Sequence, residues 1–311
     1  MTGLLVIILP VFLVMAFGFL AVWRGFFSAT SVDALMKFAQ TFAIPLLLFR
    51  AISTLDLGAG YDPGLMVSYY GASLAGFFLG MVGARFLFSR PWVDSVAIGF
   101  AALFANSVLL GLPIMERAFG PGALAPNFAI ISLHAPFCYL LGITTMEIAR
   151  GVGRGFGRTM LNVARGMFQN ALMLAIVLGF AVNLTGLALP KPLAGAFDLM
   201  ALAALPTAVF ALGGVLARYR PEGDLRVVLW ICGISLLMHP MLALVLGQRV
   251  FALPEGMVQS AVVTAAMAPG INAFVFASLY GVAQRVVATS VLAGTLLSVI
   301  SVTFWLGLLG V

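Results

Sequence analysis

Charged residues are scarce in this chain of 311 residues. They make up 8% of the sequence against 63% hydrophobic residues, and the mean hydropathy is +1.15. A soluble domain carries about 25% charged residues, so this chain lacks the polar side chains that a water-facing surface needs. Apolar runs such as residues 4–23 reach the roughly 20 residues with which a helix crosses the hydrocarbon core. Because the runs are continuous rather than alternating, they exclude barrel strands and predict an all-α integral membrane protein.

Reactive residues and catalytic motifs are also scarce. The two cysteines, Cys138 and Cys232, lie in apolar runs, which predicts packing residues rather than a disulfide or a metal site. There is no H-E-x-x-H, no paired acidic motif, no G-x-S-x-G and no lysine after a glycine-rich loop. Ser107 and His134 could form a nucleophile and a base, but no acidic third member is evident. We therefore expect neither an enzyme nor a cofactor.

Ten apolar segments alternate with short loops, which leaves no room for a soluble domain. The first segment has no basic residue before it, so we interpret it as a retained span rather than a secretory signal. The longest polar stretch, residues 150–165, lies near the middle of the chain. The predicted spans are residues 3–23, 32–55, 65–88, 93–118, 122–148, 167–189, 193–217, 225–248, 256–282 and 285–309.

The basic residues divide unequally between alternate loops. Ten spans place both termini on one side of the membrane, and one set of loops then holds only four of the 16 basic residues: Arg50, Arg117, Lys191 and Arg249. Cytoplasmic loops carry the excess of Lys and Arg, so both termini are predicted outside, which is the periplasm for a bacterial inner membrane. This rule also accounts for the net charge of +6 without any nucleic-acid partner.

Two pairs of segments indicate an internal repeat. Pro45 and Pro206 lie 161 residues apart within spans two and seven, and Asn106 and Asn272 lie 166 residues apart within spans four and nine. A duplicated unit of five spans must be inverted relative to the first, and interrupted spans at matching positions indicate a secondary transporter. The predicted divisions are residues 1–150 for the first repeat, 151–165 for a basic cytoplasmic linker and 166–311 for the second repeat.

Four sequence stretches resemble those of a known family. FANSVLLGLPI, ALPTAVFALGGVLA, MHPMLALVLG and AMAPGINAFVFASLYG look like motifs of the auxin efflux carrier family, in its bacterial malonate-transporter-like branch. The similarity runs from the first span to the last. It implies ten helices in two inverted repeats, with a scaffold and a core domain whose fourth and ninth helices are broken and cross at mid-membrane. It also implies transport of organic anions such as malonate, by an elevator-like movement of the core.

The interruptions in spans four and nine are the predicted site. Asn and Ser are good N-cap residues, so a helix is expected to restart after Asn106, with an N-terminus that suits a carboxylate. The structural alternative is that these polar residues cap a kink or join helices. The predicted substrate-binding residues are Asn106, Ser107, Gly111, Pro113, Pro269, Gly270 and Asn272.

Five further residues have two interpretations each. Pro45 and Pro206 either kink their helices or form a hinge or cavity wall. His134 and His239 either pack with a hydrogen bond or contact a proton or an anion. Arg50 either extends its side chain to the membrane interface or attracts an anion at the entrance.

Acidic residues are absent near the two interruptions, which counts against a sodium or proton antiporter of similar architecture. The alternatives that remain are an ion-coupled symporter resembling bile-acid transporters, a sodium/proton antiporter, and a channel or receptor. The expected partners are a small organic anion and the lipid bilayer. The sequence leaves open which anion is carried, the direction of transport, the coupling ion and the oligomeric state, a homodimer included.

Overall fold

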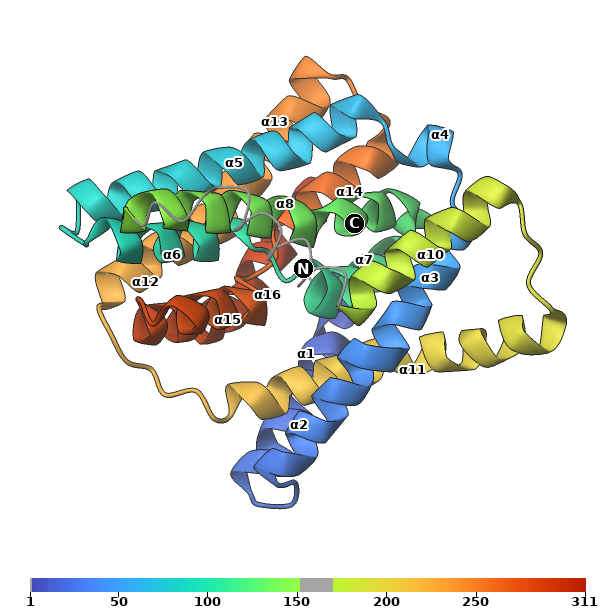
Figure 1. Cartoon of the computed structure of the whole chain (residues 1–311), viewed down its shortest axis with the longest axis horizontal. Coiled ribbons are helices and arrows are strands. Elements are labelled where there is room, and N and C mark those ends of the chain that lie inside the picture. The colour runs from blue at the N-terminus through green and yellow to red at the C-terminus, as the bar shows by residue number, and fades with distance from the viewer. Residues whose placement is uncertain (1, 152–169) are drawn as a thin grey trace. The chain divides into compact units, whose positions relative to one another are not determined.

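The computed structural model describes residues 2–151 and 170–311, and the regular secondary structure in these ranges is helical (Figure 1). The predicted linker lies outside the described residues except for Gly151. The first half contains α1 Thr2–Trp23, α2 Ala29–Phe38, η1 Ala39–Ala43, α3 Ile44–Ser53, α4 Leu57–Gly60, α5 Pro63–Phe86, α6 Trp92–Leu103, η2 Ser107–Gly111, α7 Leu112–Phe119, η3 Pro121–Leu124 and α8 Ala125–Arg150. The second half contains α10 Ala171–Thr185, α11 Lys191–Leu216, α12 Leu225–Gly233, η4 Ile234–Met238, α13 His239–Val245, η5 Leu246–Val250, α14 Glu255–Ala265, α15 Ile271–Tyr280 and α16 Gln284–Leu308.

Several helix starts are set by the local sequence. In four helices an N-cap side chain accepts a hydrogen bond from a first-turn N–H, which stabilises a helix start by about 0.5–2 kcal/mol. The capping residues are Ser28 for α2, Asp62 for α5, Asn170 for α10 and Asp224 for α12. In α5 the cap is followed by Pro63, whose missing N–H is harmless in a first turn.

Prolines coincide with changes of helix type. Three π-helical segments, η1, η2 and η4, are each followed by an α-helix with proline at its start: Pro45, Pro113 and Pro240. A proline has no N–H to donate to the carbonyl four residues earlier, and its ring would collide with that carbonyl. The preceding turn therefore widens. The irregularity predicted at Pro45 is therefore a π-helical turn, whereas Pro206 lies inside the uninterrupted helix α11.

Within the described residues, seven helical stretches of 18 to 30 residues are long and apolar enough to cross a membrane. They run over Val6–Trp23, Ala29–Ser53, Pro63–Phe86, Pro121–Arg150, Lys191–Leu216, Leu225–Val250 and Gln284–Leu308. Three shorter apolar helices are α6, α10 and α15. The chain is therefore an all-helical, multi-pass membrane protein.

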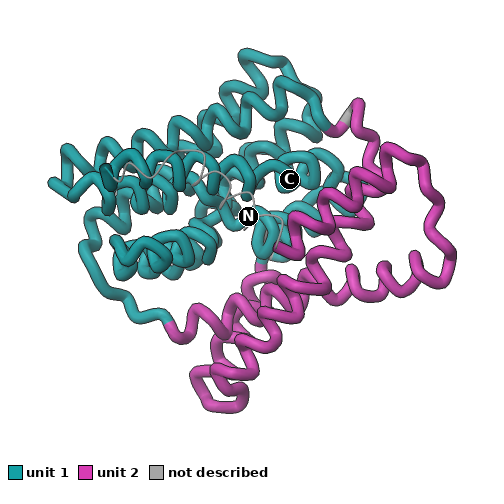
Figure 2. The backbone as a smooth tube through the Cα atoms, in the orientation of Figure 1, with its two compact units in different colours: residues 1–8, 61–160, 219–311 teal, residues 9–60, 161–218 magenta. Residues whose placement is uncertain are grey.

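The chain forms two compact units (Figure 2). Unit 1 comprises Met1–Ile8, Tyr61–Met160 and Tyr219–Val311, and unit 2 comprises Leu9–Gly60 and Leu161–Arg218. Each unit thus combines elements from both predicted repeats, because the compact units group helices by packing and the repeats divide the chain at its middle.

In unit 2, α11 runs antiparallel to α2, η1 and α3, with an ion pair near each end. Near the start of α11, Asp198 accepts a hydrogen bond from Arg50 Nε at 2.6 Å. Just beyond its end, Arg218 donates to Asp33 at 2.7 Å. Neither interpretation of Arg50 considered this partner, because Asp198 is distant in sequence and only the packing of the helices brings it close.

Glycine lets α11 contact α1 backbone to backbone. A Cβ at Gly213 would lie 1.9 Å from the Met15 carbonyl oxygen, and a Cβ at Gly18 would lie 1.9 Å from the Phe210 carbonyl oxygen. A larger residue at either position would force the two helices apart.

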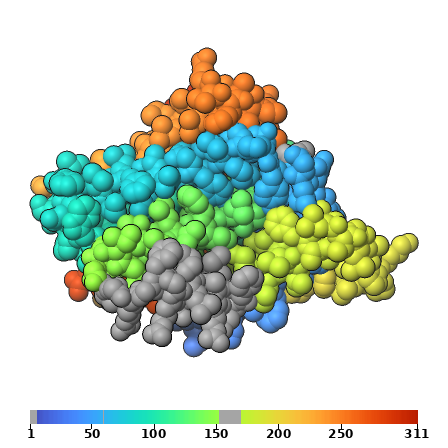
Figure 3. Space-filling model, turned by 45° about the horizontal axis from the view of Figure 1, so that its top comes forward, coloured from blue at the N-terminus to red at the C-terminus, as the bar shows by residue number. Residues whose placement is uncertain are grey.

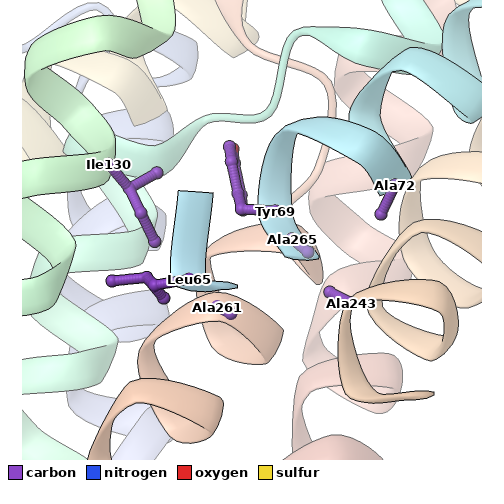
Figure 4. Packing of buried hydrophobic residues seen from close by; sticks show 7 residues of the cluster. All are labelled: Leu65, Tyr69, Ala72, Ile130, Ala243, Ala261 and Ala265. Atoms are coloured by element: carbon purple, nitrogen blue, oxygen red, sulfur yellow. The ribbon is translucent and has the colours of Figure 1, made fainter. Parts of the chain in front are cut away.

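In unit 1, α5 packs along α6 and beside α8, and Figure 3 shows α5 and α8 side by side on one face. A buried cluster joins four helices of this unit (Figure 4). It consists of Leu65, Tyr69 and Ala72 from α5, Ile130 from α8, Ala243 from α13, and Ala261 and Ala265 from α14. Tyr69 carries the polar group of this cluster, and its hydroxyl requires a hydrogen-bond partner.

Candidate functional site

Two helices of unit 1 are interrupted within the fourth and ninth predicted spans. Helix α6 ends at Leu103 and the chain becomes helical again at Ser107, so residues 104–106 form the first break. Helix α14 ends at Ala265 and α15 begins at Ile271, so residues 266–270 form the second break. Every residue in both breaks is buried.

The two breaks pair through their backbones. An antiparallel bridge joins Ala105 to Pro269, with the Asn106 N–H donating to the Ala268 carbonyl at 2.8 Å. The Gly270 N–H donates to the Phe104 carbonyl, also at 2.8 Å. These bonds satisfy backbone groups that a helix would otherwise satisfy, which is what makes non-helical backbone tolerable inside a membrane protein. The sequence pointed to both breaks but not to the bonds between them.

Two glycines allow close approach around the second break. A Cβ at Gly270 would lie 3.3 Å from a ring carbon of Phe104, which is tighter than most such contacts. A Cβ at Gly294 in α16 would lie 2.7 Å from Pro269 Cδ. Gly294 was not among the predicted site residues, since a lone glycine in a long span gives no indication of what it packs against.

The helix restarts after Asn106 as predicted. Asn106 occupies the N-cap position of η2, but its side chain makes no capping hydrogen bond. Its carbonyl accepts from the N–H groups of Leu110 and Gly111, at 3.2 and 3.1 Å. Its side-chain Nδ2 is buried and has no hydrogen-bond partner within the described residues. A buried donor without a partner costs roughly 1–3 kcal/mol, so its retention suggests a partner supplied by a ligand.

Two helix starts meet at the paired breaks. The chain becomes helical after Asn106 and again after Gly270, and no side chain caps either start. The first N–H groups of a helix have no acceptor inside it, and a helix N-terminus carries a partial positive charge of roughly half an elementary charge. Both starts can therefore donate to an anion placed beside the breaks.

The structure places the other predicted binding residues around these starts. Ser107 is 3% exposed, and Gly111 and Pro113 are buried on the same restarted helix. A Cβ at Gly111 would lie 3.4 Å from Met267 Cγ, so this turn rests against the second break. Asn272 is half-buried in the first turn of α15. The predicted set thus comes together in unit 1.

His134 of α8 contacts the first break. Its ring centroid lies 4.8 Å from that of Phe104, the first residue of the break. His134 Nδ1 lies 3.2 Å from the hydroxyl of Tyr69, and the Cys138 sulfur lies 3.8 Å from the same nitrogen. His134 therefore has hydrogen-bonding neighbours in the folded chain, and its ring contact with Phe104 connects it to the candidate site.

His239 of α13 lies on the other side of Tyr69. Their ring centroids are 5.3 Å apart, and Ser73 Oγ lies 2.9 Å from His239 Nε2. Because the Ser73 hydroxyl donates to the Tyr69 carbonyl, its oxygen accepts from a protonated Nε2 of His239. His239 therefore packs and hydrogen-bonds against α5. Its neighbours Ser73 and Tyr69 both lie outside the breaks.

A second polar pair lies near the site, and it was not predicted from the sequence. Asn127 of α8 donates from Nδ2 to Thr264 Oγ1 at 2.7 Å, one residue before α14 ends. The Asn127 Oδ1 atom is buried without a hydrogen-bond partner in the described parts of the chain. A buried asparagine in an apolar span was the signal that could have identified this pair.

The structure also locates the other residues to which the sequence assigned an interpretation. Pro45 and Pro206 belong to unit 2. His134 contacts Tyr69, Cys138 and Phe104, and no hydrogen bond joins it to Ser107 in the described part of the chain. Among residues 2–151 and 170–311, no group of three or more His, Cys, Asp or Glu side chains is arranged to hold a metal ion.

Comparison with known proteins gives matches over almost the whole chain. The family model described as "Membrane transport protein" matches residues 4–151 and 156–306. A Rhizobium meliloti (strain 1021) protein named "Putative malonate transporter" is 27% identical over 292 residues, covering 91% of this chain and 90% of the relative. The Escherichia coli (strain K12) protein named "Uncharacterized transporter YfdV" is 22% identical over 302 residues, covering 96% and 95%. The family predicted from the four motifs is therefore confirmed, and this chain belongs to the membrane transport protein family, that of the auxin efflux carriers.

Proposed function

We propose that this chain is a secondary transporter that carries small organic anions, with malonate as the first candidate, across the bacterial inner membrane. The observation that carries the proposal is the pair of uncapped helix starts beside the buried Asn106 amide, which has no partner within the described residues. Malonate enters as a candidate because a relative that aligns over 91% of this chain carries its name.

The chemistry of the breaks suits a carboxylate. An anion there would accept hydrogen bonds from first-turn N–H groups of η2 and α15 and from Asn106 Nδ2. Bonds from neutral donors let an anion bind without a permanent ion pair, so it can also leave. A carrier needs this balance, because it must release its substrate on the far side.

We further propose that the chain has ten spans in two inverted repeats. The seven long helical stretches supply seven spans, α10 supplies another, and the two interrupted segments containing α6 and α15 complete ten. In this arrangement the breaks lie at mid-membrane and both termini lie outside. Unit 1, which holds the breaks, would be the core domain and unit 2 the scaffold, with the core carrying the anion in an elevator-like movement.

A sodium-coupled symporter is the second candidate. It is favoured by the buried Asn127 Oδ1, which has no hydrogen-bond partner in the described residues and could contribute one oxygen ligand to a sodium ion. The absence of Asp or Glu from both breaks counts against it.

Uptake by reconstituted protein tests the proposal. Purified protein in proteoliposomes should accumulate radiolabelled malonate with saturable kinetics, and unlabelled small carboxylates should compete. Protein-free liposomes are the control. Malonate flux that does not saturate would instead indicate a channel, and absence of any flux above the control would refute malonate as the substrate.

A further inference from the structure

His134 is a titratable base placed against the proposed anion site. It is 3% exposed, and its ring packs on Phe104 with the ring centroids 4.8 Å apart. Phe104 and Ala105 belong to the first break, immediately before Asn106. An anion at the breaks would therefore interact electrostatically with this imidazole.

The surroundings of His134 can accept hydrogen bonds from both of its nitrogens. Nδ1 faces the Tyr69 hydroxyl, whose oxygen accepts as well as donates. Nε2 lies 3.9 Å from the Cys138 sulfur, which is a weak acceptor. An imidazolium donates from both nitrogens, and the Tyr69 oxygen and the Cys138 sulfur are the acceptors beside them.

The side chains that contact this histidine carry no full charge. The groups that face it are Tyr69 from α5, Cys138 from α8 and Phe104 of the first break, and Tyr69 in turn contacts His239 of α13. The acidic and basic side chains of these elements stand toward helix ends. They are Arg85 in α5, Asp94 in α6, Glu116 and Arg117 in α7, Glu147 and Arg150 in α8, Asp224 and Arg226 at the start of α12, Arg249 in η5 and Glu255 in α14.

An anion bound at the breaks would therefore lack a full positive partner. A buried charge is costly unless it is paired, and two helix starts supply only partial charges. A proton on His134 would give the anion an opposite charge, and the anion would do the same for the imidazolium. Each charge stabilises the other, so the proton and the anion bind cooperatively.

We propose that His134 takes up a proton when an organic anion occupies the breaks, so that the carrier moves proton and anion in the same direction. The proton comes from the water on the side where the anion enters, and it leaves with the anion on the other side. This inference rests on the proposed function, because it requires an anion at the breaks.

Proton uptake during malonate binding tests the inference. The full-length purified protein is titrated with malonate in weakly buffered solution near pH 7 that contains a pH indicator. The wild type should take up about one proton per malonate bound, and its Kd for malonate should rise by up to about tenfold per pH unit on the alkaline side.

Two histidine variants form a matched pair. His134→Gln keeps a side chain that forms hydrogen bonds but does not titrate, so malonate binding should lose both its proton uptake and its pH dependence. His239→Gln removes a histidine that is 1% exposed and hydrogen-bonded to α5 rather than to the break, and it should keep the proton uptake.

The outcomes separate this inference from the proposed function. Malonate binding by the wild type without proton uptake overturns the proton inference alone, whether or not a variant folds. Undiminished proton uptake in His134→Gln also overturns it, because the proton would then reside on the anion or on another residue. Absence of malonate binding by the wild type overturns the proposed anion site together with the inference that rests on it.

Discussion

Replacing Asn106 with alanine removes an amide whose Nδ2 has no hydrogen-bond partner within the described residues. The ligand-free protein therefore loses no hydrogen bond from that nitrogen, and its free energy of unfolding should change by no more than about 1 kcal/mol. A bound carboxylate, in contrast, loses one donor, which costs about 1–2 kcal/mol. Affinity for malonate should fall roughly 5- to 30-fold.

Asn106→Asp separates charge from shape at the same position. Aspartate is nearly isosteric with asparagine, so the substitution changes the charge at this position and hardly changes the shape. Beside a bound anion it would place two like charges roughly 4 Å apart. At an effective dielectric constant of about 20 the repulsion is about 4 kcal/mol, or close to a thousandfold in affinity. The expected order of affinity is wild type, then the Ala variant, then the Asp variant.

Malonate titration calorimetry and thermal unfolding without ligand measure the two effects separately. Asn127→Ala is the stability control, because Asn127 is 1% exposed and its Nδ2 donates to Thr264. Its loss leaves Thr264 without that partner and should destabilise the ligand-free protein by about 1–3 kcal/mol. If the Asp variant of Asn106 binds malonate better than the Ala variant, no anion binds beside Asn106 and the reasoning about the anion site fails.

Three further predictions concern topology, coupling and packing. In intact cells that express the protein without Cys138 and Cys232, an impermeant maleimide should label Leu187→Cys but not Pro221→Cys. The reverse result would invert the proposed orientation. Malonate uptake should persist when choline replaces sodium, whereas a strict sodium requirement would favour the sodium-coupled symporter. Gly213→Ala should destabilise the protein by about 1–3 kcal/mol in thermal unfolding, because its Cβ would lie 1.9 Å from the Met15 carbonyl oxygen. Gly195→Ala in the same helix, with open space around it, should be neutral or stabilising, and equal losses would refute the packing argument.

Features that depend on consecutive residues were predictable from the sequence. The apolar runs are long enough to predict membrane helices, and Asn106 and Gly270 stand where a helix in unit 1 ends and restarts. The reason is local, because a helix requires an acceptor four residues earlier for each N–H, and small or polar residues weaken that pattern. The four motifs also identified the family, since they are spread over several spans and do not depend on a single contact.

Contacts between distant residues were decided only by the tertiary structure. Asn106 N–H donates to the Ala268 carbonyl, a partner that no pattern around either residue specifies. The same holds for His134, because an isolated histidine in an apolar run is compatible with many partners, and only packing sets Tyr69 and the first break against it. The Asn106 amide shows this most clearly. Its residue type predicted a capping bond, but whether a buried donor has a partner depends on every atom around it, and only the folded chain brings those atoms together.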